Sequence, residues 1–227
     1  MSDNSEAMSS LIAAKKATRR MIKQRVQGIP QSLVVEKSGF IVDKILDMLV
    51  WKEAQAVGVF LSMPQGEVQT GRLVADAFKS GKRVFVPKTI HGSNDMELLE
   101  AKSLNDISSF PRTNWGIPEP DFINPSTGEA RVNAMDCRPP ALNVILVPGL
   151  GFDNHCRRLG RGKGFYDRYL SRFSAKTGSM PLLIAPAFEC QILDEIPVSA
   201  KDLPVDYVVT EERIVERSRK LQHDVCQ

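Results

Sequence analysis

The chain has 227 residues, of which 42% are hydrophobic and 25% charged, and its formal net charge is +3. This composition is typical of a folded globular protein with one large domain. The 30 Lys and Arg residues are nearly balanced by 27 Asp and Glu residues, which argues against nucleic acid or an anionic membrane as a partner. No apolar run approaches the roughly twenty residues that a membrane span requires.

The cysteines and the first residues bear on where the protein works. The four cysteines form no C-x-x-C pair, so neither a zinc site nor a disulfide framework is expected. Free thiols suit a reducing compartment, and we expect a cytoplasmic protein. The basic, acid-free stretch 15–25 would allow a mitochondrial presequence, but Asp3 and Glu6 precede it and argue against that interpretation.

The chain opens with two predicted helices. Residues 1–10 are small and polar, and we expect them to be disordered. Apolar residues recur at three- and four-residue spacing over 11–26, which predicts a helix that Gly28 and Pro30 end. A second helix is predicted over 33–50, with one apolar face formed by Val34, Ile41, Ile45, Met48 and Leu49.

The pattern then changes to that of an alternating α/β protein. The β-branched, apolar run 56–61 predicts a buried strand. Thr70 can cap a helix that ends at Gly81, and 84–86 is the next strand, which together make a β-α-β unit. Residues 88–140 are predicted to be irregular, with short strands, loops and a small helix at 104–108. A central strand over 143–147, a loop over 148–161 and a helix over 164–173 are predicted next. The last predicted elements are strands over 182–187 and 207–209 and a terminal helix capped by Thr210.

This alternation predicts a mainly parallel sheet with helices on both faces, a Rossmann-like three-layer α/β/α arrangement on which the N-terminal helices pack. We expect a single domain over 11–220 and a flexible tail over 221–227. Ligands of such sheets bind at the carboxyl ends of the strands. We expect the loops 62–69, 148–163 and 201–206 to leave those ends, and each contains candidate functional residues.

One segment indicates a specific chemistry. In Pro148–Asp167, three glycines at 160, 162 and 164 alternate with Arg161 and Lys163. Glycine lets the backbone approach an anion closely, and consecutive N–H groups beside a helix N-terminus bind phosphate. Arg158 adds positive charge, and Asp167, about one turn after the lysine, could bind Mg²⁺ against the phosphates. The segment is neither a Walker P-loop nor a G-x-G-x-x-G motif, and a solvated basic loop remains the alternative.

The same residues resemble a known family. The strings Val147-Pro-Gly-Leu-Gly-Phe-Asp153 and Arg158-Leu-Gly-Arg-Gly-Lys-Gly-Phe-Tyr-Asp167 are similar to the signature of the 5-formyltetrahydrofolate cyclo-ligases, also called methenyltetrahydrofolate synthetases. Further similarities, in the right order from about residue 11 to 210, are Lys15-Lys-Ala-Thr-Arg19, Phe60-Leu-Ser-Met63 followed by Glu67, Asn114-Trp-Gly-Ile-Pro118 and Val205-Asp206.

The resemblance implies an activity and a set of ligands. The family converts 5-formyltetrahydrofolate and ATP to 5,10-methenyltetrahydrofolate, ADP and phosphate, with Mg²⁺ as cofactor. Phosphorylation turns the formyl oxygen into a good leaving group, N10 attacks the activated carbon, and phosphate departs. The expected partners are ATP and the folate, with or without a polyglutamate tail, and the expected state is a monomer.

The resemblance also implies roles for individual residues. The ATP-binding positions are Lys15, Lys16, Ala17, Thr18, Arg19, Arg158, Leu159, Gly160, Arg161, Gly162, Lys163, Gly164, Phe165 and Tyr166. The folate-binding positions are Leu61, Glu67, Trp115, Arg161, Gly162, Lys163, Gly164 and Phe165. Arg161 and Lys163 stabilise charge on the transferring phosphoryl group, and Asp167 and Asp206 are magnesium ligands.

Other interpretations of these residues remain open. Lys15 and Arg19 could belong to an exposed basic helix face, Asp167 could favour a helix N-terminus, and Trp115 could be an ordinary packed aromatic residue. Phe165 stands where the family usually has Tyr, so any hydroxyl contact is lost.

His155 and Cys156 could form an acid–base pair, but we interpret them as loop residues. The alternative functions are a nucleotide- or sugar-phosphate-binding enzyme of similar fold, and an RNA-binding module, which lacks the expected aromatics.

Overall fold

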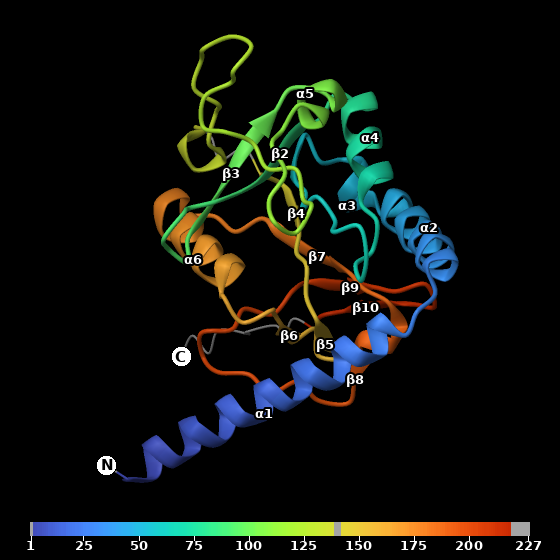
Figure 1. Cartoon of the computed structure of the whole chain (residues 1–227), viewed down its shortest axis with the longest axis vertical. Helices are drawn as coiled ribbons and strands as arrows, with labels where there is room; N and C mark the ends of the chain where they lie inside the picture. Colours follow the sequence, from blue (N-terminus) through green and yellow to red (C-terminus); the bar gives the residue numbers. More distant parts are fainter. Residues whose placement is uncertain (1, 139–141, 219–227) are drawn as a thin grey trace, which may run out of the picture.

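The computed structural model describes residues 2–138 and 142–218, with side chains from residue 5 onward (Figure 1). Its centre is a seven-stranded sheet with the strand order β10-β9-β7-β4-β1-β2-β3. The strands are β1 (Ala56–Gly58), β2 (Arg83–Thr89), β3 (Met96–Ala101), β4 (Val144–Leu146), β7 (Leu182–Pro186), β9 (Tyr207–Val209) and β10 (Ile214–Glu216). The inner strands β9, β7, β4, β1 and β2 are parallel, and antiparallel β3 and β10 form the edges. The predicted mainly parallel sheet is confirmed.

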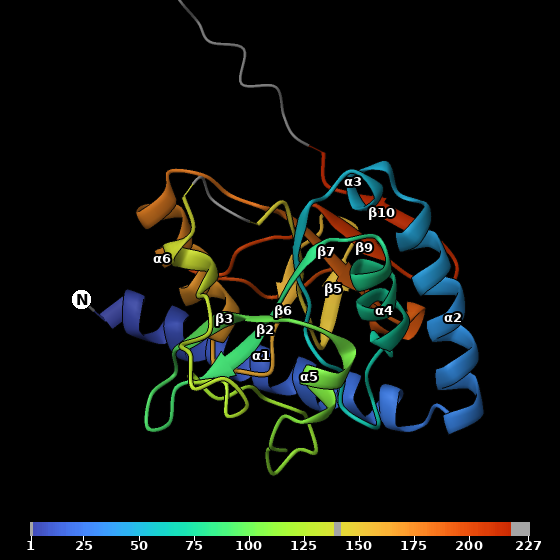
Figure 2. The ribbon, with the colours of Figure 1, turned by 90° about the horizontal axis from the view of Figure 1, so that it is seen from above.

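Helices cover both faces of this sheet because side chains alternate along each strand. In β2, Val84 and Val86 belong to one buried core, which includes residues of α2 and α4, and Phe85 belongs to a second core, which includes residues of α6. The α-helices are α1 (Ser2–Gln27), α2 (Gln31–Asp47), α3 (Leu49–Lys52), α4 (Gly71–Lys79), α5 (Leu104–Ser108) and α6 (Phe165–Thr177), and η1 (Ala134–Asp136) is a short 3-10 helix. Figure 2 shows α2 and α4 on one side of the sheet and α6 on the other.

The second predicted helix is two helices. The chain is extended at Met48 (φ −64°, ψ 130°), so α2 ends at Asp47 and α3 starts at Leu49. Leu49, predicted to be buried, is 65% exposed. The break instead places Trp51 in the core, where its indole N–H donates to Asp76 at 2.9 Å.

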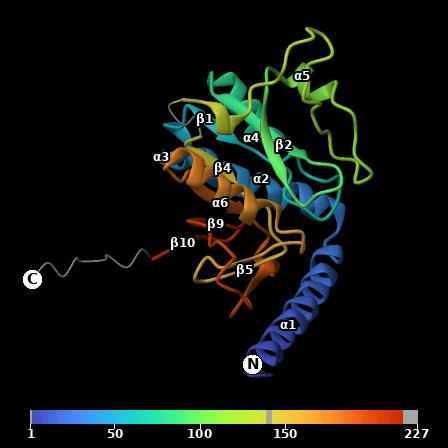
Figure 3. The same cartoon turned by 90° about the vertical axis from the view of Figure 1, so that its left-hand side faces the viewer.

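The first helix is longer than predicted. It begins at Ser2, so residues 2–10 are helical rather than disordered, and the side chains of residues 5–10 are all exposed. Figure 3 shows this first part of α1 extending beyond the sheet and its other helices. The second part packs on the domain through Ile22 and Val26, which are 0% and 5% exposed. The helix spacing therefore predicted the packed part of α1 but not its start.

Part of the predicted loop 148–161 forms a second, small sheet. Its strands are β5 (Gly151–Asp153), β6 (Arg158–Leu159) and β8 (Ile192–Leu193), in the order β6-β5-β8. Helix α1 crosses close to β5, because a Cβ atom at Gly151 would overlap Cδ1 of Ile22 and lie 3.2 Å from Cδ1 of Ile196. The glycine at this position therefore permits the close approach of α1 to the segment that leads into the functional loop.

The predicted terminal helix is wrong. After β9 the chain turns and returns as the antiparallel strand β10. The hydroxyl of Thr210 accepts hydrogen bonds from the backbone N–H groups of Glu212 and Arg213, so it caps a hairpin turn. The predicted tail over 221–227 lies outside the described residues.

We predict that Gly149→Ala lowers the free energy of unfolding by about 1–3 kcal/mol, measured by urea denaturation. A Cβ atom there would overlap the ring of Phe152 and lie 2.9 Å from its Cε1 atom. The ring is fully buried, so it cannot move aside without disturbing the core. The control is Gly39→Ala in α2, which meets no atom within 4 Å and should stabilise the helix by about 0.5–1 kcal/mol. Equal effects of the two substitutions would contradict the prediction.

A cationic loop at the carboxyl edge of the sheet

The glycine-rich segment joins β6 to α6. Gly162 and Gly164 have φ angles of +108° and +67°, a region that other residues adopt at a cost. Gly164 is also the N-cap of α6, so the segment ends at the positive end of a helix dipole. A side chain at Gly164 would meet the guanidinium of Arg168 at 3.1 Å. The local sequence therefore produces the predicted approach of glycine backbone to a helix N-terminus.

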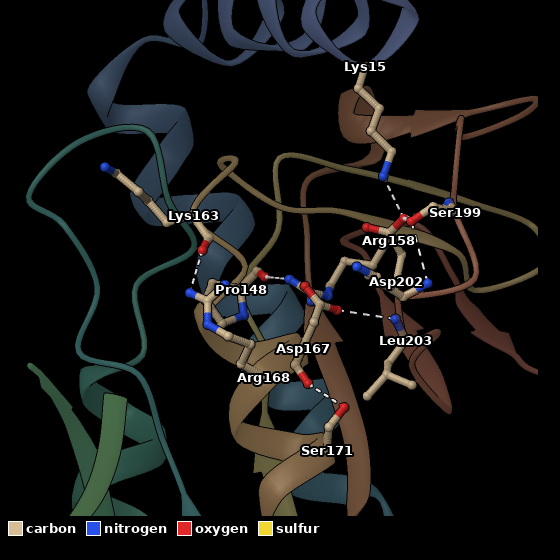
Figure 4. Close-up of polar contacts among 11 residues, drawn as sticks. Lys15, Pro148, Arg158, Lys163, Asp167, Arg168, Ser171, Ser199, Asp202 and Leu203 are labelled. Carbon is tan, nitrogen blue, oxygen red and sulfur yellow. Dashed lines mark hydrogen bonds and ion pairs between the residues drawn. The ribbon is translucent and has the colours of Figure 1, made fainter. Parts of the chain in front are cut away.

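Helix α1 contributes two predicted cations to this segment. The Arg19 guanidinium Nε donates to the carbonyl of Gly160 at 2.9 Å, and its Cζ lies 3.6 Å from where a Gly162 side chain would begin. The Lys15 ammonium donates to Asp202 at 2.5 Å (Figure 4). Burial alone would raise the pKa of Asp202, but the hydrogen bonds from Lys15 and Ser199 outweigh it and lower the pKa below the usual 3.8. The Asp202 carboxylate is therefore ionised at neutral pH.

Arg158, which was predicted to bind phosphate, is buried. Its side chain is 5% exposed, and it donates to Asp167 Oδ1 at 2.7 Å and to the Pro148 carbonyl at 3.3 Å. Its Nε atom is buried without a hydrogen-bond partner among the described residues. The backbone N–H of Leu203 also donates to Asp167 Oδ1, at 3.1 Å. These contacts fix the orientation of the Asp167 carboxylate (Figure 4).

Glu67 and Arg161 connect the loops that follow β1 and β6. The Arg161 guanidinium donates to Glu67 Oε1 at 2.9 Å, and the N–H of Met63 donates to Glu67 Oε2 at 3.0 Å. The glutamate is largely shielded and the arginine is exposed. Burial raises the pKa of Tyr166 above the ordinary 10.0 and nearby Glu67 raises it further, so the tyrosine hydroxyl stays neutral. The predicted folate-binding carboxylate thus lies beside the predicted catalytic arginine.

Lys163 is the cation of this loop that is free to meet a ligand. Its side chain is exposed, and no hydrogen bond or ion pair of its ammonium is found within the described part of the chain. Its carbonyl accepts a hydrogen bond from Arg168 at 2.6 Å, which fixes the backbone at this position. Figure 4 shows the lysine side chain directed away from Arg158 and Asp167.

Several predicted positions serve packing. Leu159 is buried in the core and Leu61 packs against it, and Phe165 packs on the second core. The Thr18 hydroxyl bonds to the Ala14 carbonyl of its own helix. Two further predicted ATP-binding residues, Lys16 and Ala17, are exposed on α1, and no side-chain contact links them to the loop in the described structure.

Trp115 lies on a loop beside the site. It is 70% exposed, so it is not the packed aromatic residue of the alternative interpretation. The adjacent Gly116 has a φ of +75°, and a side chain there would meet Pro64 at 3.4 Å. The loop with Trp115 therefore borders the loop with Glu67, and the indole is free to contact a ligand.

Asp206 does not join Asp167. Its carboxylate accepts hydrogen bonds from the N–H of Leu183 and from Arg217, each at 2.9 Å. Leu183 is near the amino end of β7, whereas Asp167 is linked through Arg158 to Pro148, beyond the carboxyl end of β4. The hydrogen bonds of Asp206 to Leu183 and Arg217 do not connect it to Asp167, and its role as a second magnesium ligand stays a prediction. Among the described residues, no group of three or more His, Cys, Asp or Glu side chains could hold a metal ion.

The sequence analysis missed the residues that hold the site in shape. Gln191, 5% exposed in the 3-10 helix η2 (Glu189–Gln191), donates its amide to the carbonyls of Gly149 and Leu150 at 3.1 and 2.9 Å. Arg168 and Asp202 were missed in the same way. Asp202 stands in the loop 201–206 that the strand pattern had marked, but no motif distinguished it from its neighbours.

The fold and the site together define an α/β protein with a cationic, glycine-rich binding site at the carboxyl edge of a mainly parallel sheet. Cations from α1 and from the loop converge there beside one oriented carboxylate. None of the helices in residues 2–138 and 142–218 has the length and apolar character that crossing a bilayer requires.

Comparisons with known proteins identify the family. A model of the 5-formyltetrahydrofolate cyclo-ligase family matches residues 11–211. The chain is 35% identical to a Mus musculus protein named 5-formyltetrahydrofolate cyclo-ligase, over 88% of this chain and 95% of that protein. An Escherichia coli K12 protein of the same name is 31% identical, over 72% of this chain and 81% of that one. The NMR structure of Aquifex aeolicus 5,10-methenyltetrahydrofolate synthetase superposes with a TM-score of 0.70 at 26% identity, over 94% and 98% of the two chains. The chain belongs to the 5-formyltetrahydrofolate cyclo-ligase family.

We predict that Cys156 is chemically inert in the folded protein and that Cys156→Ala changes kcat/KM less than about twofold. The thiol is fully buried, and burial raises its pKa to about 11. On the order of one molecule in a thousand therefore has the reactive thiolate at pH 8. Peptide mapping after iodoacetamide treatment should show slower labelling of Cys156 than of half-buried Cys137 and Cys190. Preferential labelling of Cys156, with loss of activity, would restore it as a catalytic candidate.

Proposed function

We propose that this enzyme converts 5-formyltetrahydrofolate and ATP to 5,10-methenyltetrahydrofolate, ADP and phosphate. The observation that supports the proposal is the position of Lys163 between two glycines with positive φ angles at the N-terminus of α6, with no partner for its ammonium among the described residues. A triphosphate needs this combination of backbone N–H groups and positive charge. Lys15 and Arg19 add cations from a second element, α1, so an ATP molecule would be bound from two sides.

The protein's task in this reaction is to align two substrates and stabilise phosphoryl charge. The γ-phosphoryl group passes to the formyl oxygen, N10 of the folate attacks the activated carbon, and phosphate leaves as the ring closes. Lys163 and Arg161 are the residues we assign to the charge of the transferring group. The Lys163 ammonium can contact the phosphoryl group directly. The Arg161 guanidinium must first break its ion pair with Glu67 or bind both groups.

The residues present fit the expected magnesium ion with Asp167 as the protein ligand. Mg²⁺ is commonly bound through one or two carboxylates together with substrate phosphates, rather than by an all-protein cage. Arg158 and Leu203 occupy Oδ1 of Asp167, and no hydrogen bond to its Oδ2 is found in the described structure. When bound, the ion would neutralise charge on the β- and γ-phosphates. Arg158 serves this site by holding the carboxylate in place.

The folate half of the proposed site lies beside Glu67. A carboxylate at this position can accept hydrogen bonds from pterin N–H groups, and its bond with Arg161 places it next to the phosphoryl group's cations. The exposed Trp115 and the ring of Phe165 offer aromatic surface nearby for stacking.

The proposed activity predicts a direct spectroscopic result. Mixing the protein with 5-formyltetrahydrofolate, ATP and MgCl₂ should produce the methenyl chromophore in the near ultraviolet, with one ADP formed for each product molecule. Omitting ATP, or chelating the metal with EDTA, should stop product formation because the phosphoryl transfer needs both. ADP formation that does not depend on the folate, with no chromophore, would count against the proposal.

Lys163→Ala should lower kcat at least about 10²-fold, because its charge is proposed to act on the transferring phosphoryl group. The matched control is Lys176→Ala in the last turn of α6, where the lysine is exposed and pairs with Asp136. Both variants should keep the circular dichroism spectrum and melting temperature of the parent protein, since both side chains are on the surface. Near-normal turnover by Lys163→Ala would remove the lysine from the mechanism.

A further inference from the structure

A short hairpin carries the exposed tryptophan of the site. We call residues 111–119 the tryptophan hairpin. Its two sides are joined by an isolated antiparallel bridge between Arg112 and Pro118, and by a hydrogen bond from the Thr113 N–H to the Ile117 carbonyl at 2.9 Å. Trp115 lies in the turn at the tip and is 70% exposed. The hairpin therefore presents a large aromatic side chain to solvent next to the proposed folate position.

The backbone of the turn is tightly specified. The Gly116 N–H donates to the Thr113 carbonyl at 2.8 Å, so Asn114 and Trp115 are the central residues of a β-turn. Gly116 has a φ of +75°, which glycine adopts without cost. The Thr113 hydroxyl accepts a further hydrogen bond from the Ile117 N–H at 3.3 Å. These bonds set the direction in which the Trp115 side chain leaves the chain.

The base of the hairpin is attached to the end of β2. The Glu119 N–H donates to the Pro111 carbonyl at 2.9 Å, and the Glu119 carboxylate accepts hydrogen bonds from the N–H and hydroxyl of Thr89 at 2.8 and 2.7 Å. Lys88 also pairs with Glu119, and both side chains are largely shielded from solvent. The base is thus fixed, and the tip is the part of the hairpin with freedom to move.

Arg112 restrains that tip. Its Nη1 atom donates to the Gly116 carbonyl at 2.8 Å, so its side chain runs from one side of the hairpin to the last residue of the turn. An aromatic residue in a core is held by its neighbours, but an exposed indole depends on its backbone for its position. Without this bond the turn would sample more conformations, and folate binding would have to restrict them at an entropic cost.

We propose that Arg112 is a positioning residue for the folate: its bond to Gly116 holds the turn so that the Trp115 indole stacks on the pterin beside Glu67. This inference rests on the proposed function. The hairpin borders the Glu67 loop through Gly116 and Pro64, whereas the cations assigned to ATP lie on α1 and between β6 and α6. The contribution of Arg112 is therefore expected in folate affinity and not in ATP affinity.

The test compares Arg112→Ala, Arg112→Lys, Trp115→Ala and the Arg112→Ala/Trp115→Ala double variant by calorimetric titration. Arg112→Ala should raise the Kd for 5-formyltetrahydrofolate about fivefold, the effect of losing one exposed hydrogen bond, with the Kd for Mg-ATP unchanged. Arg112→Lys keeps a charged donor for the same carbonyl and should restore the Kd to within about twofold. In the Trp115→Ala background, Arg112→Ala should leave the folate Kd unchanged, because the arginine acts through the indole.

The fluorescence of Trp115 tests the positioning before any substrate is added. The chain has two tryptophans, and Trp51 is 1% exposed, so the difference between the parent protein and Trp115→Ala isolates the Trp115 signal. Its anisotropy should fall in Arg112→Ala, because the indole gains mobility, and recover in Arg112→Lys. The control is Arg138→Ala. Arg138 is also exposed and also donates to backbone carbonyls, and its loss should alter neither the anisotropy nor the folate Kd.

Other results would overturn the inference. An unchanged folate Kd in Arg112→Ala would show that the arginine does not position the indole for binding. An effect of Arg112→Ala that persists in the Trp115→Ala background would make Arg112 a direct contact of the folate instead. Equal weakening of folate and ATP binding, with a lower melting temperature, would indicate a general structural role.

The failure of this inference can be told apart from the failure of the proposed activity. If the parent protein binds 5-formyltetrahydrofolate but forms no methenyl product, the comparison of Kd values still decides the role of Arg112. Normal turnover by the parent protein, with the same folate Kd in Arg112→Ala, would contradict the inference alone. Absence of folate binding to the parent protein would overturn both.

Discussion

The close packing of α1 on the small sheet is the constraint on which the site depends. Gly151 has no side chain, so Ile22 can lie directly over β5 with its own side chain fully buried. One to two turns before Ile22, on the same helix, Arg19 and Lys15 then reach the glycine loop and the segment before β9. If a methyl group at position 151 displaced the helix outward, both cations would shift away from these partners, because closely packed interiors cannot absorb an added group without movement of the neighbouring elements.

In the interior of the site, the charged Arg158 side chain orients the Asp167 carboxylate. Arg158 is almost fully buried and binds a carboxylate and a carbonyl, yet its Nε atom has no partner in the described structure. Removing either partner of such a buried pair typically costs about 3–5 kcal/mol, since it leaves the other charge uncompensated. Burial thus gives Arg158 a positioning role, and the exposed cations Arg161 and Lys163 remain for contact with substrates.

The cations around the loop differ in how they are held before substrate binds. Lys15 and Arg161 are paired with Asp202 and Glu67, Arg19 binds a backbone carbonyl, and the Lys163 ammonium has no partner in the described part of the chain. Preset pairs limit the ordering that binding requires, and this lowers its entropic cost. A free ammonium can follow the phosphoryl group as its charge moves during transfer.

The sequence by itself determined the central alternation of strands and helices, the mainly parallel sheet and the glycine–cation loop, because periodicity and glycine spacing are local properties. It could not determine that the chain breaks at Met48, that β10 replaces a terminal helix, or that Asp206 binds Leu183 and Arg217. Those outcomes depend on which distant segments pack together. Only the tertiary structure paired Lys15 with Asp202, since contacts between residues far apart in the chain leave no local pattern in either segment.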